Sequence, residues 1–248
     1  MKIGMYARNL CIVLVVFLLF LFTFHLFLFI FQYINRVEPF EPGRPFALTK
    51  YTKGDTYTIM EYDDFLSAEE CAELISVASK SLEPSNVYNE STDKPDPKYR
   101  ISEQAWLKKG SHAIADKIDQ FVESVTGLPV DNHEELQVVR YKEKGFFSPH
   151  YDACYGEKEF CDRMNIGSGP RLWTFMVYLN DGFEGGETHF PKTGATVTPK
   201  QGKLIVFQDT YDDADGEVIR DSFHGGNPVQ SGEKWICNKW VRHRPYRQ

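Results

Sequence analysis

The chain has 248 residues, is 42% hydrophobic and carries a formal net charge of −7. It contains no run of basic residues, which argues against a nucleic acid as its partner. Once an apolar N-terminal segment is set aside, about 210 residues remain, enough for one domain with a sizeable core.

The first feature in chain order is an apolar segment at residues 10–32. Leu10 to Phe31 contains no Asp, Glu, Lys or Arg. As a helix rising about 1.5 Å per residue it would reach roughly 33 Å, enough to cross a bilayer core. Two basic residues precede the segment, and basic flanks stay cytoplasmic. We therefore expect a single-pass type II membrane protein, with residues 1–9 cytoplasmic, a transmembrane signal anchor, and a C-terminal domain in the lumen of the endoplasmic reticulum or Golgi.

The next part of the chain is rich in turn-forming residues. Residues 33–56 contain several prolines and glycines and are interpreted as a linker that leads into a domain at 57–248. A short strand is expected at Tyr57–Tyr62. The polar stretch Glu83–Lys98 is typical of a mobile loop. It contains Asn89 in an N-x-S acceptor, which could be glycosylated only in a lumenal domain.

Two helices are predicted before the main run of strands. Ser67 and Glu70 form a capping box, in which hydroxyl and carboxylate satisfy free N–H groups, and the helix they open runs to about Lys80. A second helix over 111–125 has apolar residues at helical spacing. Gly127 is expected to end it as a C-cap.

After the second helix the hydrophobic period changes from 3.6 to 2, which favours short strands. Many short strands separated by Gly-rich or Asp-rich turns are typical of a sandwich, jelly roll or barrel, and the preceding helices would cover the outside of one sheet. The fold class is therefore mainly β with flanking helices (α+β). The expected strands are Leu136–Lys142, Phe146–Asp152, Leu172–Leu179, Glu187–Pro191, Ala195–Thr198, Lys203–Gln208, Glu217–His224 and Trp235–Arg242.

The cysteines beyond the apolar segment fall into two groups. Cys154 and Cys161 flank a short loop and could form a disulfide in an oxidising compartment, or could be two free thiols, because sequence does not fix connectivity. Cys71 lies in the first predicted helix and Cys237 in the last predicted strand, so both are expected in the core.

The tripeptide His150-Tyr151-Asp152 ends one of the expected strands. Successive side chains of a strand point to opposite faces, so His150 and Asp152 share a face. An imidazole and a carboxylate side by side are two of the three ligands of a 2-His-1-carboxylate site, which holds Fe(II) and leaves positions open. A lone H-x-D also occurs by chance as a turn or surface pair, so this interpretation depends on a third ligand.

The third ligand is expected to be His224. It stands at the end of an expected strand and is followed by two glycines, which allow a sharp turn or a close backbone approach beside a ligand. His189 is the alternative, although we expect it to face out of the sheet. In a jelly roll a late strand can lie beside an early one, so the wide separation from His150 is no obstacle.

Lys234 could anchor a co-substrate. An iron held by such a triad needs an electron source, usually 2-oxoglutarate, whose distal carboxylate needs a cation inside an apolar barrel. A buried lysine is costly without an anionic partner, so Lys234, ten residues after His224, implies either such a partner or a position in a solvated turn. The combination of H-x-D, distal histidine and lysine favours the first interpretation.

Several segments carry a resemblance to a known family. They read LQVVRY, PHYD around His150, RLWTFMVYLND, EGGETHFP, GKLIVF and HGGNPVQSGEKWICNKWVR. Over roughly residues 57–246 the chain resembles the Fe(II)- and 2-oxoglutarate-dependent prolyl 4-hydroxylases of the collagen and plant type. The resemblance implies a double-stranded β-helix (jelly roll).

The resemblance also implies roles for individual residues. The iron ligands would be His150, Asp152 and His224, and the 2-oxoglutarate pocket would contain Tyr141, Thr188, Lys234 and Trp240. Arg171 would be a catalytic arginine near the substrate, and the peptide would contact Arg100, Ser102 and Glu134. Without the resemblance, Tyr141 and Trp240 could be core aromatics, Arg171 a salt-bridge partner and Ser102 an ordinary cap.

Three positions depart from the family pattern. Relatives often carry tyrosine three residues before the first iron ligand, where this chain has Phe147. Many carry histidine eight residues after the lysine, where this chain has Arg242. The segment CYGEKEFC after Asp152 also looks unusual. All three are expected to affect which peptide is accepted.

The implied activity is hydroxylation of peptidyl proline at C4 with Fe(II), O₂ and 2-oxoglutarate, giving 4-hydroxyproline, succinate and CO₂, with ascorbate as a supporting cofactor. The implied substrate is a Pro-rich or collagen-like peptide, whose extended polyproline II backbone suits a groove. Two alternatives remain open. One is the same chemistry on another residue such as lysine, and the other is a non-catalytic jelly-roll binding module.

Overall fold

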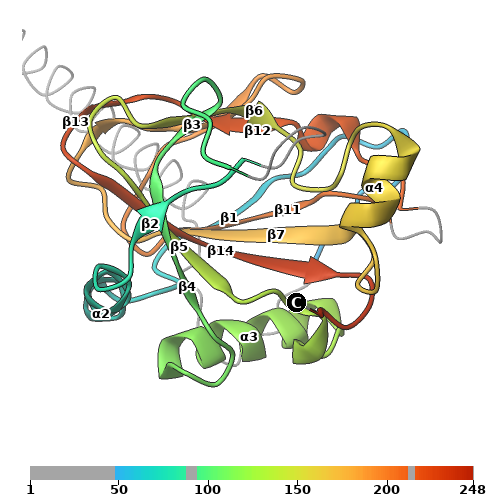
Figure 1. Ribbon diagram of the computed structural model, residues 1–248, viewed down its shortest axis with the longest axis horizontal. Coiled ribbons are helices and arrows are strands. Elements are labelled where there is room, and N and C mark those ends of the chain that lie inside the picture. Colours follow the sequence, from blue (N-terminus) through green and yellow to red (C-terminus); the bar gives the residue numbers. More distant parts are fainter. Residues whose placement is uncertain (1–47, 88–93, 212–215, 248) are drawn as a thin grey trace, which may run out of the picture. The chain divides into compact units, whose positions relative to one another are not determined.

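The computed structural model describes residues 48–87, 94–211 and 216–247. Within these ranges the chain forms two main antiparallel sheets, and two helices lie on the far side of the larger sheet (Figure 1). The larger sheet has the strand order β1-β11-β7-β14-β5-β4-β2 and the smaller one β10-β9-β12-β6-β3. This arrangement confirms the mainly β jelly-roll fold with flanking helices.

The strands that build the site come from distant parts of the sequence. The larger sheet consists of β1 (Met60–Tyr62), β11 (Leu204–Gln208), β7 (Arg171–Tyr178), β14 (Lys234–Arg242), β5 (Leu136–Tyr141), β4 (Glu103–Leu107) and β2 (Glu83–Pro84). The smaller sheet consists of β10 (Ala195–Val197), β9 (Thr188–Phe190), β12 (His224–Gly226), β6 (Phe146–His150) and β3 (Arg100–Ile101). A separate pair is formed by β8 (Glu184–Gly185) and β13 (Val229–Ser231).

Alternation along the central strands divides the apolar residues into two cores. Val138 of β5 packs with the helices, whereas its neighbour Val139 packs between the sheets. In β7 Phe175 and Met176 divide in the same way, because successive side chains of a strand point to opposite faces. The near-continuous apolar runs of these strands therefore reflect burial on both faces of the larger sheet.

The two predicted helices are present, and their ends lie within two residues of those predicted. The first, α2 (Ala68–Ala78), begins with the complete capping box, in which the Glu70 N–H donates to the Ser67 hydroxyl and the Ser67 N–H donates to the Glu70 carboxylate. The second, α3 (Ala113–Thr126), ends at Gly127, whose φ of 70° is the left-handed conformation that glycine adopts without strain. Their buried faces cover the larger sheet and leave its other face for the site.

The predicted strand Glu217–His224 is wrong. Residues Arg220–Ser222 form a 3-10 helix, and His224 is the first residue of β12. The Ser222 N–H donates to the carbonyl of Ile219, so local bonds replace the ladder that a strand would need. Neither β4 nor the short helix α4 (Lys158–Met164), whose first turn lies within the disulfide loop, was predicted from the sequence.

Cys154 and Cys161 are joined by a disulfide, which settles the alternative that the sequence left open. The bridge closes the loop that follows Asp152 and includes the first turn of α4. Cys71 and Cys237 are free and buried, as expected of core residues.

The membrane expectation requires correction. No helix in the described ranges combines the length and the apolar composition needed to cross a bilayer. The expected anchor at 10–32 lies outside the described residues, and so does Asn89. We therefore withdraw the assignment of a single-pass type II protein with a lumenal domain. The division into 1–9, 10–32, 33–56 and 57–248 stays a prediction.

Candidate active site

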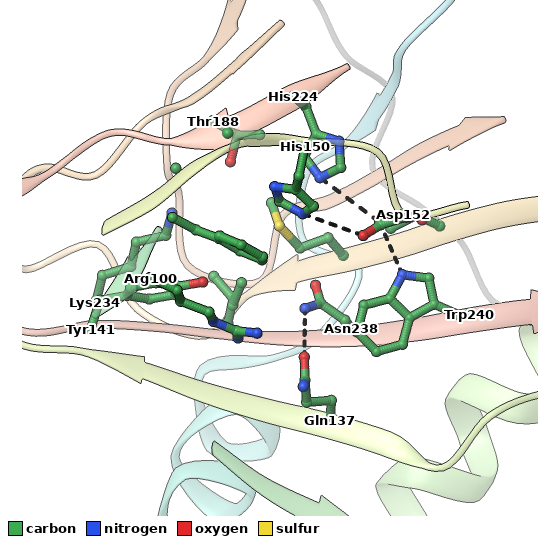
Figure 2. Close-up of a pocket in the computed structure, with 16 residues that line it drawn as sticks. Arg100, Gln137, Tyr141, His150, Asp152, Thr188, His224, Lys234, Asn238 and Trp240 are labelled. Carbon is green, nitrogen blue, oxygen red and sulfur yellow. Dashed lines mark hydrogen bonds and ion pairs between the residues drawn. The ribbon is translucent and has the colours of Figure 1, made fainter. Parts of the chain in front are cut away.

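Three side chains that could bind a metal lie close together at strands β6 and β12 of the smaller sheet. His224 lies directly opposite His150 in the antiparallel pair β12–β6, and Asp152 follows the end of β6. One donor atom from each of the three lies within 4.8 Å of the other two. The Nε2 atom of His150 is 3.4 Å from Asp152 Oδ1, and Figure 2 shows the three side chains converging. The structure therefore brings together the predicted triad, and His189 does not join it.

Backbone carbonyls hold both imidazoles in the form a metal needs. His150 Nδ1 is 2.9 Å from the carbonyl oxygen of Ser148, and His224 Nδ1 is 2.9 Å from that of Ser222. A carbonyl only accepts, so each Nδ1 must carry the proton and each Nε2 presents its lone pair to the site. Burial also lowers the pKa of His224 to about 4, which keeps this ring neutral.

The glycine after His224 is required by the close approach of the strands. A Cβ at Gly225 would lie 2.9 Å from the backbone nitrogen of Pro149 and 3.0 Å from the ring of His189. Such contacts would push β12 away from β6. The absence of a side chain therefore allows the two histidine ligands to lie opposite each other, as the sequence predicted.

Asp152 is held by two hydrogen-bond donors on one of its oxygens. The indole Nε1 of Trp240 donates to Oδ2 over 2.9 Å, and the hydroxyl of Thr174 donates to the same atom over 2.7 Å. Burial alone would raise the pKa of Asp152, but His224, His150 and Arg171 together lower it well below its usual value. The carboxylate is thus ionised, and its Oδ1 remains available toward His150.

Replacing Trp240 with phenylalanine is expected to weaken iron binding by about 10- to 100-fold, the usual effect of losing a group that supports a metal ligand. The reason is that Asp152 would lose one of its two donors while the aromatic packing is kept. Iron titration monitored by fluorescence measures the effect. Trp235→Phe is the matched control, because Trp235 lies in the same strand and packs with the helices. Equal iron affinity in both variants would contradict the prediction.

Lys234 lines one pocket together with the triad, and we call it the inner pocket. It opens β14 opposite Tyr141 of β5, and it is 3% exposed. Its ammonium donates to the carbonyl oxygen of Gly186 over 2.6 Å. No carboxylate of the described residues lies within 4.0 Å of it, because Lys234 is absent from every ion pair there. Burial lowers the pKa of Lys234 to about 7.

Two predicted pocket residues surround this lysine. The ring centroid of Tyr141 is 5.3 Å from the ammonium, and Thr188 accepts a hydrogen bond from Tyr178 over 2.7 Å. Thr188, Tyr141 and Lys234 line one pocket together with the triad (Figure 2). Its volume is about 40 Å³, so a dicarboxylate would enter only with movement of the lining side chains.

A buried network of charged side chains contacts the ring of Trp240. Both oxygens of Glu134 accept from Arg171, at 2.6 and 2.8 Å, and Arg242 donates to one of them over 2.7 Å. The guanidinium of Arg171 stacks on the Trp240 ring at 3.8 Å from its centroid. Burial would raise the pKa of Glu134, but the two arginines lower it. The carboxylate therefore orients Arg171 against the residue that holds Asp152.

Glu134→Gln is expected to lower the free energy of unfolding by about 3–5 kcal/mol, because it removes the buried carboxylate that pairs with both Arg171 and Arg242. Urea denaturation measures the loss. Glu103→Gln is the control, since Glu103 pairs with Arg140 in a partly exposed position and such pairs contribute about 1 kcal/mol or less. Similar losses of unfolding free energy in the two variants would show that the buried ion pairs of Glu134 stabilise the protein no more than the partly exposed pair of Glu103.

The predicted peptide-contacting pair lies on the edge of the site. Arg100 donates from Nε to the Ser102 hydroxyl over 2.7 Å, and its guanidinium lies 4.5 Å from the centroid of the Phe147 ring. Phe147 in turn stacks on His150 at 3.7 Å. Two departures from the family pattern thus have structural roles here. Phe147 links Arg100 to a metal ligand, and Arg242 completes the pairing of Glu134.

Sequence reasoning missed Thr174 and Asn238, which line the inner pocket. Both are polar residues on the inward face of otherwise apolar strands, between buried neighbours such as Met176 and Ile236. That interruption of the apolar pattern was the available signal. The other described histidines stay apart from the triad. His133, for example, is buried and pairs with Asp119 at 2.8 Å.

Comparison with known proteins agrees with this geometry. The family model of the 2OG-Fe(II) oxygenase superfamily matches residues 136–242, which include all three triad residues and Lys234. The chain is 31% identical over 216 residues to a putative prolyl 4-hydroxylase of Acanthamoeba polyphaga mimivirus, covering 87% of this chain and 80% of that one. It is 33% identical over 192 residues to prolyl 4-hydroxylase subunit alpha-1 of Gallus gallus, covering 77% of this chain but only 36% of that protein.

A solved structure shows the same similarity. The 2OG complex of the viral collagen prolyl hydroxylase vCPH from Paramecium Bursaria Chlorella virus-1 aligns with a TM-score of 0.60 at 33% identity, over 74% of this chain and 95% of that chain. The sequence match to the mimivirus protein, the superposition on the viral enzyme and the His-Asp-His triad agree. The chain therefore belongs to the prolyl 4-hydroxylase family of Fe(II)- and 2-oxoglutarate-dependent oxygenases.

Proposed function

We propose that this chain hydroxylates peptidyl proline at C4, as a dioxygenase of the procollagen-proline type that uses Fe(II), 2-oxoglutarate and O₂. One observation carries the proposal. A triad suited to Fe(II) lines the same pocket as a buried lysine that has no carboxylate partner among the described residues and so suits a dicarboxylate. The chain spans about a third of the length of the vertebrate alpha-1 subunits that it matches, so their full activity is not transferred to it.

The donor set fits Fe(II). Two neutral imidazoles and one ionised carboxylate are the three protein ligands of the 2-His-1-carboxylate site, and they leave coordination positions for co-substrate and O₂. His150 and His224 each direct Nε2 toward Asp152. When bound, the iron together with 2-oxoglutarate and O₂ supplies the oxidising chemistry, and succinate and CO₂ are the by-products.

The protein's own residues bind and orient the reactants. Lys234 would pair with the distal carboxylate of 2-oxoglutarate, beside the hydroxyls of Tyr141 and Thr188. Trp240 would act on the co-substrate pocket through Asp152, to which it donates, rather than only as part of the wall. The apolar core between the sheets would keep water away from these charged groups.

The peptide would lie in a second, wider cavity of about 620 Å³. His150, Asp152 and Arg100 line it, so a peptide there would have access to the metal. We assign peptide contact to Arg100, which Ser102 orients, and a position near the substrate to Arg171. Glu134 would act by orienting Arg171, because both its oxygens are already occupied.

The experiment is a peptide panel analysed by mass spectrometry for a gain of 16 Da. Pro-rich peptides should gain it in the presence of Fe(II) and 2-oxoglutarate, with one succinate formed for each oxygen inserted. Fragmentation should place the oxygen on proline, and hydrolysis should yield 4-hydroxyproline. Modification of lysine instead would favour the alternative residue. Absence of 2-oxoglutarate consumption with every peptide would favour a binding module. Ascorbate is expected to prolong turnover, which repeating the assay without it would test.

A further inference from the structure

The wider cavity carries a charge opposite to that of the chain. Its lining contains five arginines and only two carboxylates, those of Glu134 and Asp152. The chain as a whole has a formal net charge of −7. On an acidic protein, a basic groove attracts negatively charged ligands, which the rest of the surface repels. The charges of the lining residues therefore bear on the choice of peptide.

Three of the five arginines have no acidic partner among the residues that the structure describes. Glu134 binds Arg171 and Arg242, and Asp152 is committed to the triad. The remaining lining arginines are Arg100, Arg163 and Arg247. None of these three has a carboxylate of the described residues within 4.0 Å, since none takes part in an ion pair there.

Arg163 and Arg247 belong to a wall formed by α4 and the end of the described chain. The Arg247 N–H donates to the hydroxyl of Ser168, just beyond α4, over 3.0 Å. Arg242 binds the carbonyl oxygen of Gly169 over 2.7 Å, which ties the same two segments together. The disulfide that closes the preceding loop anchors the other end of α4. The backbone segments that carry Arg163 and Arg247 are thus held in place by hydrogen bonds and by the disulfide.

The same wall presents apolar side chains to solvent. Tyr155, Met164 and Ile166 are exposed and line the cavity, and Ile166 is 75% exposed. They make up three of the five large hydrophobic residues exposed in the described ranges. The centroid of the Phe160 ring lies 6.0 Å from the guanidinium of Arg163. Apolar surface interrupted by unpaired cations suits an extended peptide that carries both apolar and acidic residues.

We propose that the substrate is an acidic proline-containing peptide, and that Arg163 and Arg247 select an Asp or Glu near the target proline. The inference rests on the proposed function, because it places the peptide in the cavity that His150 and Asp152 of the triad also line. A carboxylate beside these arginines would be attracted, and a lysine at the same position would be repelled. The two arginines are positioned for specificity and take no part in the reaction itself.

Three peptides test the proposal, identical except for Asp, Ala or Lys on each side of the target proline. The value of kcat/KM is expected to be about fivefold higher for the Asp peptide than for the Ala peptide, and lower again for the Lys peptide. In the double variant Arg163→Gln, Arg247→Gln the ratio of Asp to Ala peptide should fall toward one. In Arg163→Glu, Arg247→Glu the Lys peptide should become the better substrate. Each ratio is measured within one variant, so a loss of folded protein cancels.

Arg244→Gln is the matched control. Arg244 lies in the same C-terminal segment and is exposed, but it does not line the cavity, so its ratio should equal that of the unaltered protein. Raising the salt concentration should shrink the preference, since exposed charges are screened. Equal kcat/KM for the three peptides, or an unchanged ratio in the double variants, would overturn the proposal.

Fluorescence anisotropy of labelled peptides gives a second readout that does not need turnover. The same order of affinity, Asp above Ala above Lys, is expected with Fe(II) and 2-oxoglutarate present under nitrogen. If no peptide is hydroxylated but this order holds, proline hydroxylation fails while the acidic preference stands. If all three are hydroxylated and bind equally, the enzyme assignment stands and the acidic preference fails.

Discussion

In a His150→Ala variant the rate of hydroxylation is expected to fall by more than about 100-fold. Losing a group that only supports a metal ligand costs up to about 100-fold, and losing a ligand itself should cost more. His150 presents Nε2 to the site and lies opposite His224, so the substitution removes one of the two imidazole ligands. Asp152→Ala should have an effect at least as large, because Asp152 is the carboxylate that the triad contributes. Succinate formation and the 16 Da product gain measure the loss, and metal analysis should show less bound iron.

His243→Ala is the control for this experiment. His243 is exposed and lies outside the residues that line either cavity, so both iron content and turnover should match the unaltered protein. Thermal unfolding of the variants, measured without iron, separates a lost ligand from a lost fold. Retention of iron and of more than a tenth of the activity in His150→Ala would mean that the metal is held elsewhere.

Lys234→Met is expected to raise the KM for 2-oxoglutarate by about 30-fold or more, since removing one partner of a buried charge pair costs about 2–5 kcal/mol. Methionine keeps the length and apolar stem of lysine. The unaltered protein should gain thermal stability when 2-oxoglutarate is added, because only the folded state binds it. The variant should lose this gain, which differential scanning fluorimetry measures.

The same substitution should stabilise the protein when no 2-oxoglutarate is present. In the folded state burial lowers the pKa of Lys234 from 10.5 to about 7. Below pH 7 the folded protein must therefore keep a buried ammonium, and the free-energy cost is present in full. As pH rises from 7 to 10.5 the folded state releases its proton before the unfolded state does, so this contribution to stability increases.

The advantage of Lys234→Met over the unaltered protein should thus be largest near pH 6.5 and should shrink by pH 9.5. Binding of 2-oxoglutarate to the unaltered protein should weaken over the same range, because the dicarboxylate needs the protonated amine. Urea denaturation at the two pH values and calorimetric titration test both. Lys80→Met, at an exposed position, should show neither effect. A pH-independent difference between Lys234→Met and the unaltered protein would mean that the amine is not buried in solution.

Local patterns predicted much of the scaffold. The capping box at Ser67 and the left-handed Gly127 define helix ends through bonds within one or two turns, so neighbours in sequence carry the information. The prediction of a strand at Glu217–His224 was wrong because the local pattern did not decide the structure there. Its composition suited a strand, but Arg220–Ser222 satisfy their backbone locally, and only His224 reaches β6.

Part of the site could also be predicted. H-x-D, a distal histidine before two glycines, and a lysine ten residues later are patterns with a chemical meaning, and the structure brings these residues into one pocket. Asp152, however, lies beyond the end of β6 and not on the strand as predicted. The hydrogen bonds that hold these residues in place could not be predicted in the same way. The pairing of Trp240 with Asp152 joins residues 88 apart in sequence, and no pattern along the chain indicates it.

The sequence alone determined which side chains are available for chemistry, since ligand type and spacing follow from residue identity. It also determined the mainly β class, because alternation along a strand is a local property. The tertiary structure decided that His224 rather than His189 joins the triad and that Glu134 pairs with both Arg171 and Arg242. It also decided that Arg163 and Arg247 have no carboxylate partner in the described part of the chain. These outcomes depend on how the two sheets face each other and on what α4 and the C-terminal segment cover. Such long-range geometry results from the packing of the whole domain, and no short stretch of sequence contains it.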